Sequence, residues 1–188
     1  MIRDIKDDVK KVLYSEEQLA KRVKEMAEEI SKDYAGKDLL VVGILKGSVL
    51  FTSDLIKNIS IPCEIDFMAV SSYGNSAQTS GVVRILKDLD SDIENKHVLI
   101  VEDIVDTGTT LSYLLEYLKA RKAASIEIVA LLDKEARRTS NVSAKYKGFD
   151  VPDEFIVGYG IDYAEKYRNL PFIGALKEEI YNKQFKIL

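Results

Sequence analysis

The sequence is poor in cysteine and histidine and has no long hydrophobic run. Its one cysteine, Cys63, cannot form an intramolecular disulfide, and its place in an expected strand indicates a buried, inert thiol in a reducing compartment. No apolar run approaches the ~20 residues that a membrane span needs. The amino terminus mixes both signs of charge and lacks the apolar core of a signal peptide. We therefore expect a cytoplasmic protein with no membrane partner.

An excess of basic residues is also missing. The chain has 27 Lys and Arg residues against 31 Asp and Glu residues, which gives a net charge of −4. This balance argues against broad electrostatic attraction to nucleic acid, so we expect no nucleic-acid partner. Internal repeats, low-complexity tracts and evident linkers are absent too. The simplest interpretation is that residues 1–188 form a single domain.

Hydrophobic periodicity predicts alternating strands and helices along most of the chain. Ser15 and Gln18 have the spacing of a capping box, and an apolar stripe follows at helical spacing. The expected elements are a helix over 15–34, a strand over 39–45, a helix from 48, strands over 63–70, 82–86 and 97–101, a helix over 111–121, a strand over 126–132 and a short strand near 155–157. Residues 135–150 are predicted to form a solvated loop or short helix, and residues 176–188 fit helix and strand equally. The alternation indicates an α/β fold with a mostly parallel sheet and helices on both faces.

The segment from residue 98 to residue 111 concentrates polar groups beside a buried strand. Four aliphatic residues lead into the adjacent acids Glu102 and Asp103, which no buried strand would tolerate unpaired. A third acid, Asp106, precedes a short turn. The turn consists of Thr107, Gly108, Thr109 and Thr110. Its glycine permits close backbone approach, and its amides can point at an anion. We predict that Glu102 and Asp103 lie at the carboxyl end of the strand, where open α/β sheets bind ligands.

Other expected strands also end in polar residues. Lys46 and Gly47 follow one strand, Lys134 follows another, and Asp162 lies beyond the last. The carboxyl ends of parallel strands share one edge of the sheet, so these groups should converge. Neither glycine turn fits the dinucleotide fingerprint or the P-loop. A phosphorylated sugar with a divalent ion suits the pattern better, with amides and hydroxyls for phosphate, carboxylates for ribose hydroxyls or metal, and lysines for further oxygens.

Residues 98–110 resemble the phosphoribosyl-diphosphate binding motif of type I phosphoribosyltransferases. The shared pattern is an aliphatic run, two acids, two aliphatic residues and an acid that leads to Thr-Gly-x-Thr. Further segments narrow the resemblance to the hypoxanthine (6-oxopurine) branch. They are Leu45-Lys46-Gly47, Ser72-Tyr73-Gly74, Leu132-Asp133-Lys134 with Arg137-Arg138, and residues 151–163. The resemblance implies the type I phosphoribosyltransferase fold, with a small hood subdomain built from the terminal segments.

The resemblance also implies roles for the residues that follow the central strand. Glu102 and Asp103 would face the ribose hydroxyls and Mg²⁺, which Asp162 would also coordinate. Asp106, Thr107, Gly108, Thr109 and Thr110 would hold the 5′-phosphate. Asp106 resembles the family's general acid/base, which exchanges a proton with purine N7 while the new bond forms at N9.

Base recognition and diphosphate binding would fall to other segments. By resemblance, Lys134 would donate to the 6-oxo group, Phe155 would stack on the base, and the backbone of Ile156 would read its edge. Lys46, Gly47 and Arg168 would hold the diphosphate. Residues 71–81 are small and polar, which predicts a mobile loop, and the resemblance makes Ser72 and Tyr73 part of a lid that excludes water.

The implied reaction belongs to purine salvage. It moves the phosphoribosyl group from 5-phosphoribosyl 1-diphosphate to N9 of hypoxanthine or guanine, and it gives IMP or GMP and diphosphate. A xanthine-preferring enzyme remains an alternative, as does a regulator that uses the same fold to sense a ligand or bind RNA.

Considered without the resemblance, Lys134 is typical of a surface lysine and Phe155 of an aromatic residue in the core. Arg137 and Arg138 fit a solvated loop, and Arg138 is the better candidate to support the site. We expect a homodimer or homotetramer.

Overall fold

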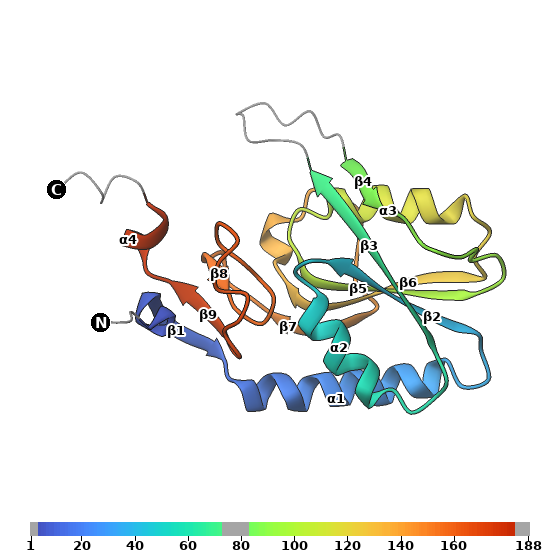
Figure 1. Cartoon of the computed structure of the whole chain (residues 1–188), viewed down its shortest axis with the longest axis horizontal. Helices are drawn as coiled ribbons and strands as arrows, with labels where there is room; N and C mark the ends of the chain where they lie inside the picture. The colour runs from blue at the N-terminus through green and yellow to red at the C-terminus, as the bar shows by residue number, and fades with distance from the viewer. Residues whose placement is uncertain (1–3, 73–82, 183–188) are drawn as a thin grey trace.

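The main element of the fold is a six-stranded sheet, seen on the right of Figure 1. The structure is a computed structural model that describes residues 4–72 and 83–182 of the 188-residue chain. In spatial order the strands are β4 (Val83–Lys87), β3 (Glu64–Ser72), β2 (Leu39–Leu45), β5 (His97–Val105), β6 (Ser125–Asp133) and β7 (Tyr146–Asp150). Neighbouring strands pair in parallel except β3 and β4, which pair antiparallel. The predicted, mostly parallel sheet is confirmed.

Helices cover both faces of this sheet. They are α1 (Glu16–Asp33), α2 (Val49–Asn58) and α3 (Thr109–Lys119). Val41 and Leu99 pack in one core with α1 and α2, whereas Val42 and Ile100 pack in a second core with α3. Because successive strand side chains point to opposite faces, a continuous aliphatic run supplies both cores at once. The α/β fold class with helices on both faces is therefore confirmed. None of the described helices is both long and apolar enough to cross a membrane.

Local sequence signals set the boundaries of the helices. The Ser15 hydroxyl accepts from the Gln18 N–H at 3.3 Å, and Gln18 Oε1 accepts from the Ser15 N–H at 2.8 Å, which completes the predicted capping box. The helix α3 follows Gly108, whose φ of +80° lies in the left-handed region that favours glycine. Two short 3₁₀ helices occur at Ile5–Asp8 and Glu135–Arg137, and a single turn, α4, spans Glu178–Tyr181.

A smaller antiparallel sheet joins segments from both ends of the described chain. Its order is β1 (Val9–Tyr14), β9 (Ile173–Leu176) and β8 (Ile156–Val157). Figure 1 shows this sheet beside the main sheet, with the blue and red ends of the chain side by side. The sequence does not predict the strands β1 and β9, because β1 lies in a highly charged segment and β9 follows Pro171 closely.

Residues 146–150 require a correction. They form the edge strand β7, parallel to β6, rather than a solvated loop. The segment is mostly polar, so its sequence does not indicate that one side faces the core. On that side Tyr146 is buried, and its hydroxyl donates to Asp33 Oδ2 at 2.7 Å. An edge strand needs only one paired side, so its sequence can remain polar.

Candidate functional site

The turn between β5 and α3 encloses a cavity of about 90 Å³ at the carboxyl end of β5. The residues around it are Glu102, Ile104, Val105, Asp106, Thr107, Gly108, Thr110 and Leu111. The first turn of α3 begins at Thr109, next to this cavity. The N–H groups of a first helical turn have no intrahelical acceptor, and the helix dipole favours negative charge there. The turn cavity therefore suits a phosphate group.

The segment 138–140 supports this turn from behind. Arg138 Nε donates to the Asp106 carbonyl oxygen at 3.2 Å, and its guanidinium also bonds the Asp133 carboxylate and the Val142 carbonyl oxygen. Ser140 Oγ donates to the Thr107 carbonyl oxygen at 3.0 Å. Arg138 is mostly buried and fixes the backbone of the turn rather than merely solvating a loop.

Glu102 and Asp103 lie within β5, which continues to Val105, so the prediction that the strand ends before them is wrong. Ladder pairing with β6 extends past both acids. Their positions alternate along the strand, so they face different sides. Glu102 borders the turn cavity, whereas the Asp103 carboxylate lies so close to Gly47 that a Cβ there would overlap it. A side chain at position 47 would therefore have to displace the Asp103 carboxylate.

Burial raises the pKa of both acids. The pKa of Asp103 rises to about 6, because burial and the charge of Asp162 outweigh the Ile104 N–H and the Arg168 guanidinium, which lower it. The pKa of Glu102 lies well above its usual value through burial and the adjacent charge of Asp103. Two acids that are costly to ionise alone are suited to a cation or to hydroxyl donors.

Two cations lie near these acids, each paired with a carboxylate. Lys46 Nζ is 2.9 Å from Glu165 Oε2, and Arg168 Nη2 is 2.8 Å from Asp162 Oδ1. Arg168 Nη1 also donates to the Gly160 carbonyl oxygen at 2.8 Å. Lys46 is exposed, so an incoming anion can replace Glu165 with little structural change.

The predicted metal ligands do not form a complete cage. Within residues 4–72 and 83–182, no three His, Cys, Asp or Glu side chains converge as a metal site would require. Glu102 and Asp103 face different sides, and Asp162 is paired with Arg168. Mg²⁺ is commonly bound through one or two carboxylates plus substrate phosphates and water. The donors present fit an ion that arrives with a phosphorylated ligand.

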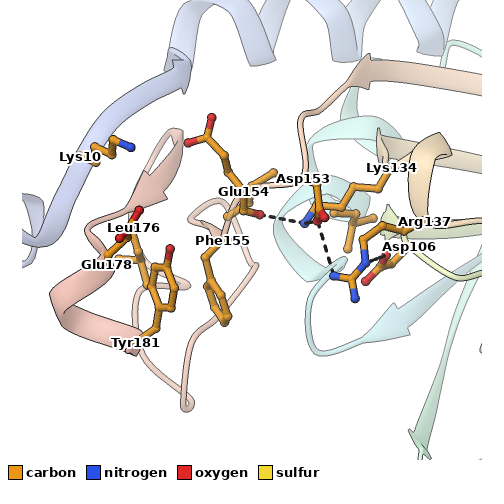
Figure 2. Close-up of a pocket in the computed structure, with 12 residues that line it drawn as sticks. Lys10, Asp106, Lys134, Arg137, Asp153, Glu154, Phe155, Leu176, Glu178 and Tyr181 are labelled. Carbon is orange, nitrogen blue, oxygen red and sulfur yellow. Dashed lines mark hydrogen bonds and ion pairs between the residues drawn. The ribbon is translucent and has the colours of Figure 1, made fainter. Parts of the chain in front are cut away.

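A second cavity of about 460 Å³ lies between the main sheet and the small sheet (Figure 2). It is lined by Lys10, Ile104, Asp106, Lys134, Arg137, Asp153, Glu154, Phe155, Ile156, Leu176, Glu178 and Tyr181. Lys134 is almost buried, and its Nζ donates to the Glu154 carbonyl oxygen at 2.8 Å. The Phe155 ring is partly exposed and stacks on Tyr181, with 4.7 Å between the ring centroids. An aromatic face beside a buried donor suits a flat heterocycle that carries a carbonyl group.

Charged side chains form a connected group on one side of this pocket, with dashed lines between them in Figure 2. Asp153 Oδ1 is 3.8 Å from Lys134 Nζ and 3.7 Å from Arg137 Nη1. Arg137 Nε is in turn 3.4 Å from Asp106 Oδ1. The sequence alone assigns no role to Asp153 or Tyr181, and it predicts a solvated loop position for Arg137. Their position in or near motif segments was a signal, but only their contacts show what they face.

Asp106 borders both the turn cavity and the larger pocket. Asp106 therefore lies between the turn cavity, which suits a phosphate, and the larger pocket that Phe155 lines. Of the predicted lid residues, Ser72 ends β3, so the predicted loop does not begin at residue 71. Tyr73 and the remainder of that predicted loop lie outside the described residues.

The fold and this composite site define a transferase of phosphorylated sugars. The family model described as "Phosphoribosyl transferase domain" matches residues 10–164, so the chain belongs to the phosphoribosyl transferase family.

Within that family the similar proteins include several hypoxanthine-guanine phosphoribosyltransferases. The hypoxanthine-guanine phosphoribosyltransferase of Bacillus subtilis (strain 168) is 54% identical over 177 residues, which cover 94% of this chain and 98% of that protein. The protein of the same name from Staphylococcus aureus (strain Mu50) is 56% identical over 176 residues, 94% of this chain and 98% of its own length. A crystal structure of a hypoxanthine phosphoribosyltransferase from Staphylococcus aureus superimposes with a TM-score of 0.92 at 55% identity, covering 96% of this chain and 98% of the other.

Proposed function

We propose that this protein catalyses a purine salvage reaction that joins a phosphoribosyl group to hypoxanthine or guanine. The donor is 5-phosphoribosyl 1-diphosphate, and the products are IMP or GMP and diphosphate. The observation that carries this proposal is the position of Asp106 between the turn cavity and the pocket of Lys134 and Phe155. Relatives more than 50% identical over nearly their whole length bear the name of this activity.

The turn cavity holds the 5′-phosphate. Thr107, Gly108 and Thr110 line this cavity, Thr109 begins α3 beside it, and the dipole of α3 favours the charge of the phosphate. Glu102 and Asp103, one on each side of β5, accept hydrogen bonds from the ribose hydroxyls. Lys46, Gly47 and Arg168 bind the diphosphate once Glu165 and Asp162 release the two cations.

The larger pocket, lined by Lys134 and Phe155, holds the base and is named the base pocket. Phe155 stacks on the purine ring, and the backbone of Ile156 contacts the ring edge. Lys134 Nζ turns from the Glu154 carbonyl oxygen to the 6-oxo group. Because Lys134 is only a donor, it fits the carbonyl of hypoxanthine or guanine better than the amino group of adenine. The same preference extends to xanthine, which also carries a 6-oxo group.

The reaction forms one bond and breaks another at the same carbon. N9 of the base attacks C1′ of the ribose, and the bond from C1′ to the diphosphate oxygen breaks, with its electron pair leaving on the diphosphate. The Asp106 carboxylate accepts the proton from N7 as the N9–C1′ bond forms. Asp106 acts as the catalytic residue, and the remaining groups bind and orient the reactants.

Mg²⁺ fits this site as a companion of the substrate. Asp103 and Asp162 are close enough for their charges to interact, and each supplies carboxylate oxygens of the kind Mg²⁺ prefers, with Glu102 on the other side of β5. When bound, the ion offsets the negative charge of the leaving diphosphate.

We also propose that residues 1–188 act as one domain in which the small sheet forms a hood over the base pocket. Ser72 and Tyr73 belong to a lid over the ribose, and the protein acts in the cytoplasm as a homodimer or homotetramer. The basis for the hood is the wall that β8, β9 and α4 contribute to the larger pocket. Size-exclusion chromatography with light scattering tests the oligomeric state.

Steady-state assays with hypoxanthine, guanine, xanthine and adenine, each with and without Mg²⁺, test the proposed function. We expect Mg²⁺-dependent formation of IMP and GMP and little product from adenine. Strong use of adenine would contradict the role of Lys134. Predominant use of xanthine would favour the alternative of a xanthine-preferring enzyme. Salt-dependent RNA binding without any nucleotide formation would instead favour the regulator alternative.

A further inference from the structure

We propose that Arg137 is a positioning residue that orients the Asp106 carboxylate toward the base. This inference rests on the proposed role of Asp106 as the acid/base and extends it to a residue that no resemblance assigned. Arg137 lies in the short 3₁₀ helix after Lys134, and its guanidinium extends into the base pocket (Figure 2).

The backbone and the side chain of Asp106 are held differently. Arg138 fixes the backbone of Asp106 through its carbonyl oxygen. The side chain lacks an equivalent anchor, because within the described part of the chain no hydrogen-bond donor reaches the buried atom Asp106 Oδ1. The nearest cation is Arg137, with its Nε 3.4 Å from that oxygen. Two adjacent arginines thus contact Asp106: Arg138 bonds its backbone, and Arg137 forms an ion pair with its carboxylate.

Arg137 is itself paired with Asp153, which lies beside it in the pocket (Figure 2). Asp153 Oδ1 lies 3.7 Å from Arg137 Nη1 and 3.8 Å from Lys134 Nζ. Atoms O6 and N7 are neighbours on one edge of a 6-oxopurine, so Lys134 and Asp106 must address adjacent atoms. A series of ion pairs, from Lys134 through Asp153 and Arg137 to Asp106, therefore connects the two groups that contact this edge.

The charges and exposures indicate an effect on rate rather than on folding. The side chains of Arg137 and Asp106 are 48% and 40% exposed, and exposed ion pairs stabilise folded proteins little. A catalytic group displaced by about 1 Å can nevertheless lower a rate about 100-fold. Arg137 does not need to touch the reacting atoms, since holding the Asp106 oxygen in line with N7 is sufficient.

The test compares Arg137→Gln with Arg137→Lys, each made in the wild-type chain and in Asp106→Asn. We expect Arg137→Gln to lower kcat with hypoxanthine about 10-fold, within the range of small displacements of a catalytic group. The KM for 5-phosphoribosyl 1-diphosphate should stay within about twofold, because no diphosphate or 5′-phosphate ligand is altered. Arg137→Lys, which keeps the charge, should recover most of the lost kcat. In the Asp106→Asn background, Arg137→Gln should have less than about a twofold effect, since coupled residues are not additive.

Two further variants serve as controls. Asp153→Asn removes the anchor of Arg137 and should lower kcat in the same direction but less. Glu135→Gln changes a charge in the same 3₁₀ helix without lining the pocket, and its kcat should match that of the wild type.

The outcomes separate this inference from the proposed function. If Asp106→Asn abolishes turnover while Arg137→Gln retains wild-type kcat, the acid/base role stands and the positioning role is overturned. If Arg137→Gln costs the same factor in both backgrounds, Arg137 acts independently of Asp106, and the inference is overturned as well. If Asp106→Asn retains wild-type kcat, the proposed role of Asp106 fails first, and the inference fails with it.

Discussion

The turn cavity and the base pocket meet at Asp106 but are built in different ways. Residues 102–111, one continuous segment, supply every residue that borders the turn cavity. The base pocket takes its walls from β1, β5, the segment after β6, the segment around β8, the end of β9 and α4. A site for a phosphate can be made from consecutive backbone amides, whereas a site for a flat base needs faces and edges that one segment does not provide.

The two cavities also differ in how firmly they are held. The turn is fixed by the mostly buried pair of Arg138 and Asp133, whose side chains are 14% and 11% exposed. The base pocket is held by exposed pairs such as Lys11 with Glu154 and Arg137 with Asp106. This contrast suits a rigid phosphate site next to a pocket whose ionic contacts can exchange when a base enters.

The largest effect is expected at the residue that both cavities share. Asp106→Asn should lower kcat about 100- to 10,000-fold, because an amide cannot accept the N7 proton. Binding of 5-phosphoribosyl 1-diphosphate should change little, as the amides of the turn remain. Steady-state kinetics with titration calorimetry of the donor would measure both quantities. Near-wild-type turnover would remove Asp106 from the acid/base role.

The difference in rigidity can be tested with the adjacent arginines. Arg138→Gln should lower the free energy of unfolding by about 3 kcal/mol, because it leaves a mostly buried Asp133 without its main partner. Arg137→Gln should lower it by less than about 0.5 kcal/mol, since its pairs are exposed. Urea unfolding of both variants measures the difference. Equal losses would show that the turn is held no more firmly than the pocket.

The chemical selectivity of the pocket depends on Lys134. Lys134→Met keeps the length of the side chain but removes its donor, so kcat/KM for hypoxanthine should fall about 10- to 100-fold. The KM for the phosphoribosyl donor should be unaffected. Lys11→Met is the matched control, because Lys11 pairs with Glu154 on the same wall but is exposed, and kcat/KM should stay within about twofold. A similar loss in both variants would indicate a general effect of charge.

The smallest effect on activity is expected outside both cavities, at Asp66 on β3. Burial raises the pKa of Asp66, but the N–H groups of Asp90 and Phe67 and the Lys87 ammonium outweigh it, so the pKa lies below its usual value. Because the folded-state pKa is lowered, the carboxylate stabilises the fold above the unfolded pKa of about 4, and that contribution is lost as the pH falls through the folded-state value.

Asp66→Asn therefore should cost more stability at pH 7 than at pH 3, with kcat unchanged at pH 7. Urea unfolding at both pH values measures the cost. An equal cost at both pH values would mean that the hydrogen-bonding geometry of Asp66, rather than its charge, stabilises this part of the sheet.

The accuracy of the sequence predictions follows the same contrast between local and assembled structure. The strand at 39–45, the capping box at Ser15 and the turn after Asp106 were predictable because their signals are contiguous. The edge strand β7 was mistaken for a loop, because its polar residues show burial only at Tyr146, which packs against α1. The strands β1 and β9 pair across most of the chain, and no short-range pattern marks such a pairing.

For the site, sequence identified the groups but not their neighbours. Asp106, Lys134 and Phe155 could be named from motifs, whereas Arg137, Asp153 and Tyr181 could be assigned to the pocket only from their contacts. The aliphatic run predicts a strand over 97–101 with Glu102 and Asp103 at its carboxyl end, although the ladder continues past them. Charge alone does not end β5, because the ladder with β6 continues as far as Val105.

The sequence by itself determined the parallel sheet, the phosphate turn and the acid at its start, since these depend on hydrophobic periodicity, glycine conformation and helix capping within short windows. Only the tertiary structure decided which side chains share the base pocket, which arginine supports the backbone of Asp106 and which one faces its carboxylate. The physical reason is that periodicity and turn chemistry are local properties of the chain. A contact between Arg137 and Asp106, or between β1 and β9, exists only after distant segments have packed together.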